Sequence, residues 1–387
     1  MTPQTIGRVQ SPRIIRIGGG VAAEVAEVLT QLGLSRPLIV TDTNLVALGH
    51  VQVITDSLDA AHIRSDIFDG VVEDPTDLCV DAGLAVWRAG DFDCIIGFGG
   101  GSPMDTAKAI SFMSVNEGHV RDYKAPRQID RCGPPVIAIP TTGGTGSELT
   151  RWCVITDTQS PEKYNLSGLA CVATAALIDW TFTITKPARI TADTAVDSLT
   201  HAIEAYVSRK AFDYADAFAL AAMPAIATHV RTAVADPENA EARSALMLAA
   251  SQAGMAFSNA SVALVHGMSR PIGAHFHVAH GLSNAMLLPE LTRFSIGAAP
   301  ARYATCARVM GMAQRGDSDA VASEKLVEGL TRLNDDLKVP NPSSLGHVAD
   351  DAMLTLMAGQ ALASGSPQNN PRVPTQDEIV QLYRAIW

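Results

Sequence analysis

The first half of the chain alternates short apolar runs with segments of helical spacing. The apolar runs, many of them rich in β-branched residues, predict strands at residues 13–17, 37–42, 63–68, 94–98 and 136–140. Apolar positions recur at helical spacing over residues 21–32, 43–58, 75–89 and 104–113. This alternation favours an α/β domain in which helices cover both faces of a parallel sheet.

The second half changes character near Pro187, where the strand signals disappear. Alanine, leucine and methionine dominate there, and helical patterns cover residues 191–207, 213–231, 238–257 and 323–333. A chain of 387 residues is also long enough for two domains. We therefore predict an α/β domain over residues 1–186 and an all-helical domain over residues 187–387.

Composition narrows the class of protein. Hydrophobic residues make up 47% of the chain and charged residues 18%, so a large core is expected. The formal net charge is -11 and no basic run is present, which speaks against nucleic acid and anionic membrane as partners. The six cysteines form no C-x-x-C pair, and the first twenty residues lack the apolar stretch of a signal peptide. We therefore expect a cytoplasmic protein without a disulfide framework or a membrane span.

Two glycine-rich turns in the first half are typical of nucleotide binding. Gly99, Gly100, Gly101 and Ser102 lie between a strand and a helix, where the backbone can approach a pyrophosphate and helix N–H groups can bind its charge. Residues 140–148 follow another strand and hold four hydroxyls and three glycines. The second turn is not a P-loop, because no Gly-Lys-Ser/Thr follows its glycines. Its alternative reading is a polar surface loop.

Asp42 lies at the C-terminal end of a predicted strand. A carboxylate there can accept hydrogen bonds from an adenosine ribose and would repel a 2′-phosphate, which favours NAD over NADP. The alternative is an aspartate that caps a helix or a turn. The residue alone leaves both readings open.

Asp197 and His201 are four residues apart, which places them on one face of a helix, one turn from each other. Ala195, Val196 and Leu199 surround the pair with apolar side chains, so the helix is expected to be buried and both polar groups need partners. A divalent metal is one such partner. An Asp–His hydrogen bond inside a core is the alternative.

A second polar cluster lies further along the chain. It comprises an arginine and four histidines: His266, Arg270, His275, His277 and His280. On one continuous helix Arg270, His277 and His280 would all lie within roughly 40° of His266, and His275 would point the opposite way. Pro271 and Gly273 are expected to kink or break that helix, so the spacing does not decide between His277 and His280. One carboxylate with three imidazoles is a donor set suited to Fe²⁺ or Zn²⁺.

On these motifs the chain resembles the iron-containing (group III) alcohol dehydrogenases, which are related in fold to glycerol dehydrogenase and dehydroquinate synthase. The matching motifs span nearly the whole chain: Gly99-Gly-Gly-Ser-Pro-Met-Asp105 with Ala107-Lys108, Pro140 to Glu148, Asp197-x-x-x-His201-x-x-Glu204-x-Tyr206, and His266 with His280-Gly281 fourteen residues later. The resemblance implies a Rossmann-like NAD-binding domain, an all-helical metal-binding domain and an active site between them. Family members commonly form dimers or larger assemblies.

The resemblance also assigns residues. It implies metal ligands at Asp197, His201, His266 and His280, and so selects His280 over His277. It places NAD over Gly99 to Ser102 with Asp42 at the adenosine ribose. Further cofactor contacts are implied at Thr141, Thr142, Thr145 and Lys163. Asp105, Glu148 and Glu204 also match family motifs, and we interpret them as structural.

The chain departs from the family at Arg270, where many members carry a second histidine that is thought to relay protons. We predict that His277 replaces it in proton exchange and that His275 is structural. A guanidinium one turn from His266 suggests a clamp for an anionic group, so we predict small aldehydes or hydroxy compounds with a carboxylate, sulfonate or phosphonate.

The predicted function is a reversible, NAD- and metal-dependent oxidation of a small alcohol to an aldehyde or ketone. Three alternatives are a zinc glycerol-type polyol dehydrogenase, a dehydroquinate-synthase-like lyase, and a binding protein without enzymatic activity.

Overall fold

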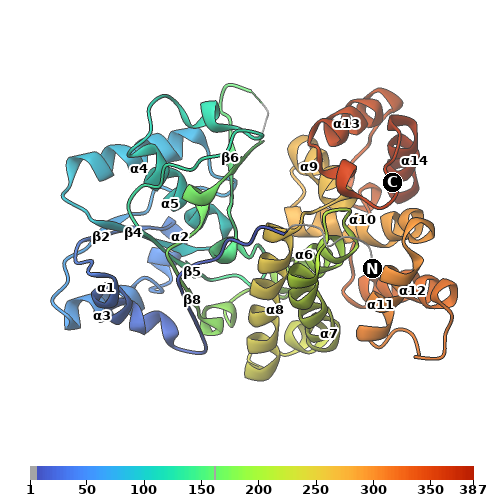
Figure 1. Ribbon diagram of the computed structural model, residues 1–387, viewed down its shortest axis with the longest axis horizontal. Coiled ribbons are helices and arrows are strands. Elements are labelled where there is room, and N and C mark those ends of the chain that lie inside the picture. The colour runs from blue at the N-terminus through green and yellow to red at the C-terminus, as the bar shows by residue number, and fades with distance from the viewer. Residues whose placement is uncertain (1–6, 161–162) are drawn as a thin grey trace. The chain divides into compact units, whose positions relative to one another are not determined.

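The computed structural model describes residues 7–160 and 163–387 of the chain (Figure 1). The chain forms two compact units, each with its own hydrophobic core. One unit comprises residues 9–186, and the other comprises residues 187–387 together with the described residues ahead of Val9.

The first unit contains a six-stranded sheet in which each neighbouring pair of strands runs parallel. The strands lie in the order β1-β8-β5-β4-β2-β3. Their bounds are β1 (Ile14–Ile17), β2 (Pro37–Val40), β3 (Asp66–Phe68), β4 (Cys94–Gly99), β5 (Val136–Pro140) and β8 (Ala175–Ile178). The predicted α/β fold class is therefore confirmed.

Helices cover both faces of this sheet (Figure 1). They are α1 (Val25–Leu32), α2 (Thr43–Ala47), α3 (Gln52–Ala60), α4 (Asp77–Ala89) and α5 (Gly101–Met113). Strand β2 is buried on both faces. Its Leu38 and Val40 belong to the core under α4 and α5, whereas Ile39 belongs to the core under α1 and α3. A strand buried on both sides reads as a continuous apolar run, as this one does.

The order of the strands creates a switch point between β2 and β4. The chain passes from β2 to β3 on one side, and then returns to β4 on the other side of β2. In open parallel sheets, ligands bind at the carboxyl ends of the strands at such a point. Asp42 follows β2 there, and Gly99 ends β4.

Two predictions for this unit need correction. Residues 43–58 were expected to form one helix, but the chain turns at Gly49, whose φ of +73° separates α2 from α3. The antiparallel hairpin of β6 (Trp152–Thr156) and β7 (Lys163–Ser167) and the strand β8 were not predicted. The hairpin strands hold polar residues in alternation, and β8 is a short alanine-containing run, so neither has a strong strand signal.

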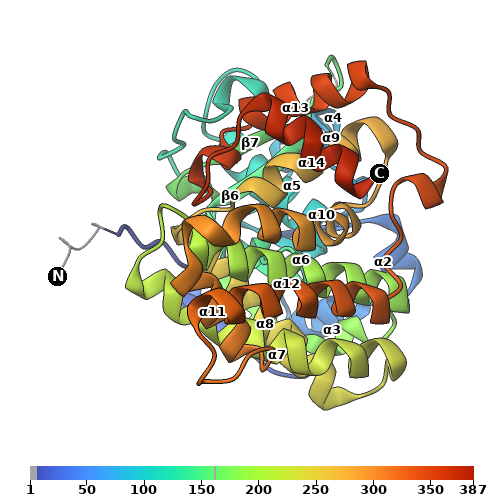
Figure 2. The same cartoon turned by 90° about the vertical axis from the view of Figure 1, so that its right-hand side faces the viewer.

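The second unit is built of helices, which face the viewer in Figure 2. They are α6 (Ala188–Val207), α7 (Asp213–Ala235), α8 (Ala240–Asn259), α9 (Leu264–Phe276), α10 (His280–Ser295), α11 (Pro300–Val309), α12 (Asp319–Asp336), α13 (Asp351–Ala363) and α14 (Gln376–Ile386). Helix α6 packs against α7, α8 and α10, and almost all its side chains from Thr191 onwards are buried. A central, buried helix therefore carries Asp197 and His201.

A kink or a break was expected at Pro271 and Gly273, and the break does not occur. Helix α9 continues through both residues and ends at His277, which adopts a left-handed conformation with φ +55°. The proline removes one hydrogen bond, but Met268 and Ile272 on either side of it are fully buried and hold the helix in place. His277 and His280 consequently do not lie on the same helix as His266.

Helix α7 is long and apolar enough to cross a membrane by length and composition. It packs against α6 and α8, and Ala219, Met223 and Ile226 on it are fully buried. A buried core helix passes the same test, so α7 is accounted for by packing within this unit.

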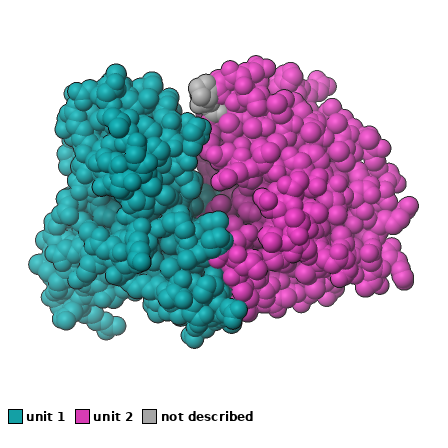
Figure 3. All heavy atoms as spheres, turned by 180° about the vertical axis from the view of Figure 1, so that it is seen from behind, with its two compact units in different colours: residues 1–8, 187–387 teal, residues 9–186 magenta. Residues whose placement is uncertain are grey.

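The division into units falls after Lys186 (Figure 3). Residues 7 and 8 belong to the helical unit, although the sequence placed them with the α/β domain. Gly7 is one reason, because its Cα lies against the ring of Phe212, which precedes α7. The start of the described chain is therefore tied to the helical unit by packing.

Candidate active site

Three helices of the second unit supply the four side chains that were expected to bind a metal. Helix α6 carries Asp197 and His201 one turn apart, and both are buried. His266 lies in the first turn of α9 and is also buried. His280 is the first residue of α10, and its side chain is 44% exposed. The i, i+4 spacing places the first two on one face, and the packing of α9 and α10 brings in the others.

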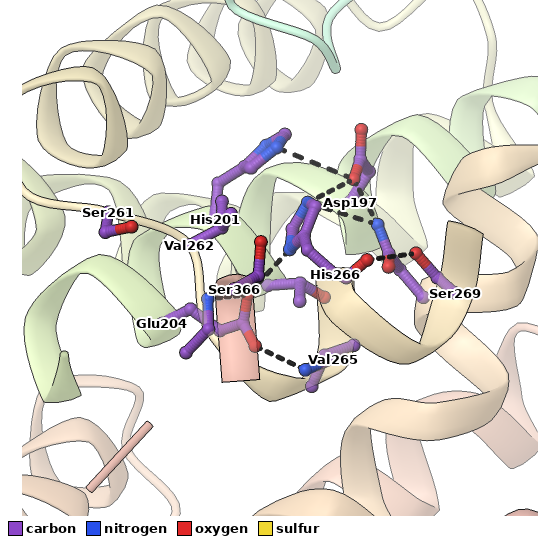
Figure 4. A network of polar contacts seen from close by, with 12 residues as sticks. Asp197, His201, Glu204, Ser261, Val262, Val265, His266, Ser269 and Ser366 are labelled. Atoms are coloured by element: carbon purple, nitrogen blue, oxygen red, sulfur yellow. Dashed lines mark hydrogen bonds and ion pairs between the residues drawn. The ribbon is translucent and has the colours of Figure 1, made fainter. Parts of the chain in front are cut away.

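The three imidazoles converge on one carboxylate oxygen. Oδ1 of Asp197 lies 3.5 Å from Nε2 of His266, 3.7 Å from Nε2 of His280 and 3.9 Å from Nε2 of His201. Ligand atoms of Asp197, His201 and His266 all lie within 4.8 Å of one another. Figure 4 shows these three side chains directed toward one another.

These separations fit a divalent cation better than direct hydrogen bonds. A hydrogen bond from nitrogen to oxygen spans about 2.7–3.2 Å, so the three contacts are too long. Ligand atoms about 2.1 Å from a tetrahedral cation stand about 3.4 Å apart, which is close to the spacing found here. The donor set of one carboxylate and three imidazoles also suits Fe²⁺ or Zn²⁺.

Electrostatics within the cluster favour a charged carboxylate. Burial raises the pKa of Asp197, but the imidazoles of His201, His280 and His266 outweigh burial and hold that pKa well below its usual range. Burial lowers the pKa of His266, but hydrogen bonds and charge interactions with Asp197 and Glu204 raise it overall. The carboxylate of Asp197 is therefore ionised at neutral pH and can serve as a ligand.

Glu204 fixes the orientation of His266. Its Oε2 lies 2.7 Å from Nδ1 of His266, and its two oxygens also accept hydrogen bonds from the backbone N–H groups of Ala263 and Val265. This contact leaves Nε2 of His266 directed at Asp197, as in many metal sites where a carboxylate orients a histidine ligand. Phe257 stacks on the His201 ring with a centroid distance of 4.2 Å and gives that imidazole an apolar neighbour.

His275 and His277, which were not assigned as metal ligands, are not part of this cluster. His277 is exposed at the end of α9, and it is not among the side chains that converge on Asp197. His275 pairs its Nε2 with Oε1 of Gln360 at 2.8 Å, which agrees with the structural role predicted for it. The proton-exchange role of His277 stays a prediction.

Arg270 lies one turn after His266 and is partly buried. Its Nη1 donates a hydrogen bond of 3.0 Å to Oγ of Ser366. Burial lowers the pKa of Arg270, and the charge of Glu204 opposes that effect. Among the described residues no carboxylate approaches Arg270 within ion-pair distance, so its charge is not neutralised by a direct pair.

The first unit brings the predicted nucleotide-binding turns together at the carboxyl edge of its sheet. Gly99 ends β4 with φ +151°, and a Cβ there would lie 2.5 Å from Cγ of Pro103, so only glycine fits. Helix α5 starts at Gly101, immediately after the turn, and directs its N–H groups to this edge. The backbone N–H of Thr141 bonds to the carbonyl of Gly99 at 2.8 Å.

The loop after β5 lies against this turn. A Cβ at Gly100 would be 3.6 Å from Oγ1 of Thr142, and one at Gly101 would be 3.1 Å from Cγ2 of Thr145. The hydroxyl of Thr141 is buried and has no hydrogen-bond partner among the described residues. A backbone cradle beside an unsatisfied hydroxyl fits the pyrophosphate of NAD.

Two further candidate cofactor residues have protein partners. Oδ1 of Asp42 accepts a hydrogen bond from the backbone N–H of Leu45 and so caps α2. This is the alternative that the sequence left open, although the second carboxylate oxygen has no role in that cap. Lys163 at the start of β7 forms an ion pair of 2.6 Å with Asp74. Neither contact decides whether the residue also binds NAD.

Family profiles match both halves of the chain. The profile described as iron-containing alcohol dehydrogenase matches residues 12–180, and the one described as the C-terminal part of the Fe-containing alcohol dehydrogenase family matches residues 191–387. The chain belongs to the iron-containing alcohol dehydrogenase family.

Two characterised members of this family are similar over almost their whole length. The chain is 37% identical to a 1,3-propanediol dehydrogenase of Klebsiella pneumoniae, with 97% of each chain covered. It is 36% identical to an NAD-dependent methanol dehydrogenase of Bacillus methanolicus, with 95% of this chain and 96% of the relative covered. The similarity thus covers both units of the chain.

Solved structures of the family agree with the fold. The structure of a 1,3-propanediol oxidoreductase superimposes with a TM-score of 0.96 at 36% identity, covering 99% of this chain and 100% of the other. A sulfoacetaldehyde reductase of Bifidobacterium kashiwanohense in complex with NAD⁺ superimposes with a TM-score of 0.90 at 26% identity, covering 99% of each chain.

Membership of the iron-containing alcohol dehydrogenases confirms several predictions. The chain is an oxidoreductase that acts on CH–OH groups, and NAD and Fe²⁺ are its expected cofactors. These relatives do not favour the zinc polyol dehydrogenase or the lyase that were considered as alternatives. Family membership by itself does not assign roles to individual residues.

Two residues that support the sites were given no role from the sequence, although Lys108 matches a family motif. Lys108 is fully buried, and its Nζ donates to the carbonyls of Ser147 and Trp152 at 2.6 and 2.9 Å, so it holds the loop after β5 in place. Asn284 lies one turn after His280 and is also fully buried. The i, i+4 spacing from His280 is the sequence signal that points to Asn284.

Proposed function

We propose that Asp197, His201, His266 and His280 together bind Fe²⁺ in this dehydrogenase, with Zn²⁺ or another divalent ion as a substitute. The observation that carries the proposal is the convergence of three imidazole nitrogens on Oδ1 of Asp197 at 3.5–3.9 Å. One carboxylate and three imidazoles at that spacing form a donor set that a divalent cation can bind with all four groups at once.

NAD is proposed to bind at the carboxyl edge of the sheet, at the switch point between β2 and β4. The turn at Gly99 to Ser102 and the N-terminus of α5 supply backbone donors for the pyrophosphate. Thr141, Thr142 and Thr145 supply hydroxyls beside it. Asp42, whose Oδ2 is not used in the cap of α2, is positioned after β2 to accept hydrogen bonds from the adenosine ribose.

The chemistry divides between the cofactors and the chain. When bound, a divalent cation supplies a Lewis acid for the substrate oxygen, and NAD supplies the hydride acceptor. Glu204 holds His266 in the orientation that ligation needs, and Phe257 excludes water from one side of His201. His277, exposed beside the start of α10, is the proposed group for proton exchange with solvent.

The proposed substrate is a small alcohol or aldehyde with an anionic group. Arg270 supports this proposal because it lies one turn from His266 and carries no ion-pair partner among the described carboxylates. A guanidinium of this kind suits the two oxygens of a carboxylate or sulfonate. One structurally similar family member is named for sulfoacetaldehyde, a sulfonate, whereas others are named for neutral propanediol and methanol. Substrate charge is therefore the property to test.

We also propose that the enzyme is cytoplasmic and acts as a homodimer or a larger homo-oligomer. All six cysteines are free, and five of them are buried, as suits a reducing compartment. Strand β1 is at the edge of the described sheet, and its Ile15 and Ile17 are 41% and 50% exposed. An edge strand with exposed apolar side chains is suited to pairing with another chain. Sedimentation velocity would report a monomer if this proposal is wrong.

The function is tested with full-length protein reconstituted with Fe²⁺. NADH absorbance is followed with matched neutral and acidic aldehydes, and reduction of at least one class is expected. Asp197→Ala should lose activity by about a hundredfold or more while NADH still binds. Asp193→Asn is the matched control, because Asp193 lies one turn earlier on α6 and pairs with Arg189 instead. Equal activity of the Asp197 variant and the control would refute the metal-site assignment.

A further inference from the structure

Asn284 is a polar residue of α10 that contacts three of the candidate metal ligands. It is fully buried, one turn after His280. Its Nδ2 lies 2.7 Å from Oδ1 of Asp197 and 3.3 Å from Nε2 of both His266 and His280. One amide nitrogen thus approaches three of the four proposed ligand atoms.

The contact with Asp197 fixes which end of the amide faces the ligands. An amide oxygen at 2.7 Å from a carboxylate oxygen would be repelled, whereas an N–H group donates a strong charge-assisted hydrogen bond. The amide nitrogen therefore belongs at this position. Its second hydrogen can point to one of the imidazole nitrogens, which accept when their other nitrogen carries the proton.

The other end of the amide shows that Asn284 is not held by the surrounding core. Its Oδ1 is buried and has no hydrogen-bond partner among the described residues. Buried polar groups usually have partners elsewhere in the protein, and an orphaned acceptor is unfavourable. All the hydrogen bonds found for this side chain thus involve the ligand cluster. A residue that served only to pack α10 against α6 would be better as an apolar side chain.

We propose that Asn284 is a positioning residue of the metal centre, which holds Oδ1 of Asp197 at the point where the imidazoles converge. The proposal rests on the metal ligation proposed above and adds a residue to it. The hydrogen bond restricts the Asp197 carboxylate to one orientation, so less ordering is needed when a cation binds. Residues that orient ligands in this way typically change metal affinity by about 10–100-fold.

The test measures Co²⁺ binding to the metal-free, full-length protein, because the visible absorption of bound Co²⁺ reports coordination geometry. Asn284→Leu removes both amide groups and keeps the number of side-chain heavy atoms and the branching at Cγ. It should weaken Co²⁺ binding by about 10–100-fold and alter the absorption bands. Asn334→Leu is the matched control, because Asn334 donates a 2.7 Å hydrogen bond to the carbonyl of Ala285 and does not contact the ligands. The control should leave Co²⁺ affinity and spectrum unchanged.

A double-mutant cycle separates positioning from a general effect on folding. If Asn284 acts through Asp197, the substitution should change affinity by less than about threefold in an Asp197→Ala background. An equal loss in both backgrounds, or unchanged affinity and spectrum in the single variant, overturns the proposal. If the Asp197→Ala protein binds Co²⁺ too weakly to measure, the comparison of Asn284→Leu with its control Asn334→Leu decides.

An Asn284 variant that does not fold and an unmodified protein that binds no Co²⁺ are different outcomes. If Asn284→Leu does not fold, Asn284→Ser, which keeps a small donor, is measured in its place. The same weakening of Co²⁺ binding and the same change in the spectrum are expected. If the unmodified protein binds no Co²⁺, the proposed metal centre itself is wrong, and the role of Asn284 falls with it. Binding by the unmodified protein together with unchanged binding by the Asn284 variants rejects the positioning role alone.

Discussion

Oε2 of Glu204 lies 2.7 Å from Nδ1 of His266, and both residues are buried. The two backbone N–H groups that also bond to Glu204 come from the residues just before His266, so the start of α9 is held at this carboxylate. A glutamate that we had interpreted as structural from its motif is therefore in contact with a proposed metal ligand. It sets both the tautomer and the direction of the ring.

Replacing Glu204 should weaken metal binding more than it affects the fold. We expect Glu204→Gln to reduce Co²⁺ affinity by about 10–100-fold, because a neutral amide is a poorer acceptor for the Nδ1 hydrogen of His266. Affinity is measured by competition with a chelator. Glu241→Gln, at an exposed position on α8, is the control. Wild-type affinity in Glu204→Gln would show that the carboxylate only anchors the backbone.

Metal affinity should fall as the pH drops, and earlier than for ordinary histidines. Because the pKa of His266 is raised, protons compete with a cation for Nε2 at higher pH than they would for an exposed imidazole. Once His266 titrates, the apparent dissociation constant for Co²⁺ should rise by about tenfold per pH unit. In Glu204→Gln the onset should move to lower pH. A flat affinity between pH 8 and 6 would contradict this.

The raised pKa of His266 should act in the opposite direction on the stability of the metal-free protein, which should fall as the pH rises. A raised pKa means that the folded state binds the proton more tightly than the unfolded state. The stabilisation by His266 is therefore complete below its unfolded pKa of about 6.5 and is lost as the pH rises through the folded-state pKa. Melting temperatures of metal-free protein, scanned from pH 6 to 8, should show this loss, and His266→Gln should abolish it.

The sequence predicts the parts of the site that lie on one helix, whereas the other parts depend on how the helices end and pack. Asp197 and His201 share a face because the helical period alone determines it. Helical spacing did not separate His280 from His277, which only the family resemblance did; their actual placement depends on the end of α9, at the left-handed turn of His277 rather than at Pro271. A local rule for proline failed there because buried neighbours hold the helix together.

The α/β fold was predictable because each central strand is a continuous apolar run. The order of the strands was not, since the switch point between β2 and β4 follows from how the chain crosses the sheet. Asp42 illustrates the difference: its place at the end of a strand was visible in the sequence, whereas its use as the cap of α2 appears only in the structure.

The glycine at the end of β4 should be essential for the cofactor and irrelevant to the metal. Gly99→Ala places a methyl group 2.5 Å from Pro103 at a φ of +151°, so the turn must distort. We expect the dissociation constant for NADH, measured by fluorescence titration, to rise by about tenfold or more, with Co²⁺ affinity unchanged. Gly297→Ala is the control, because nothing lies within 4 Å of its added Cβ.

Arg270 should distinguish substrates by charge. Arg270→Ala is expected to raise KM for an acidic aldehyde by about tenfold or more, and to change KM little for a neutral aldehyde of the same length. Arg384→Ala, which removes an exposed ion pair with Asp351, should affect neither. An equal loss on both classes of substrate would mean that Arg270 supports the fold through Ser366 instead of binding an anion.

Substitutions at Asp42 can separate its role as the cap of α2 from its proposed role in binding NAD. Asn is as good a helix cap as Asp, so Asp42→Asn should keep the hydrogen bond from Leu45 and leave thermal stability unchanged. Loss of the negative charge should still narrow the preference for NADH over NADPH, because a 2′-phosphate is no longer repelled. Asp42→Ala should show the same narrowing and also lose about 1 kcal/mol of stability with the cap. An unchanged cofactor preference in both variants, with lower stability only in the alanine variant, would leave Asp42 with the capping role alone.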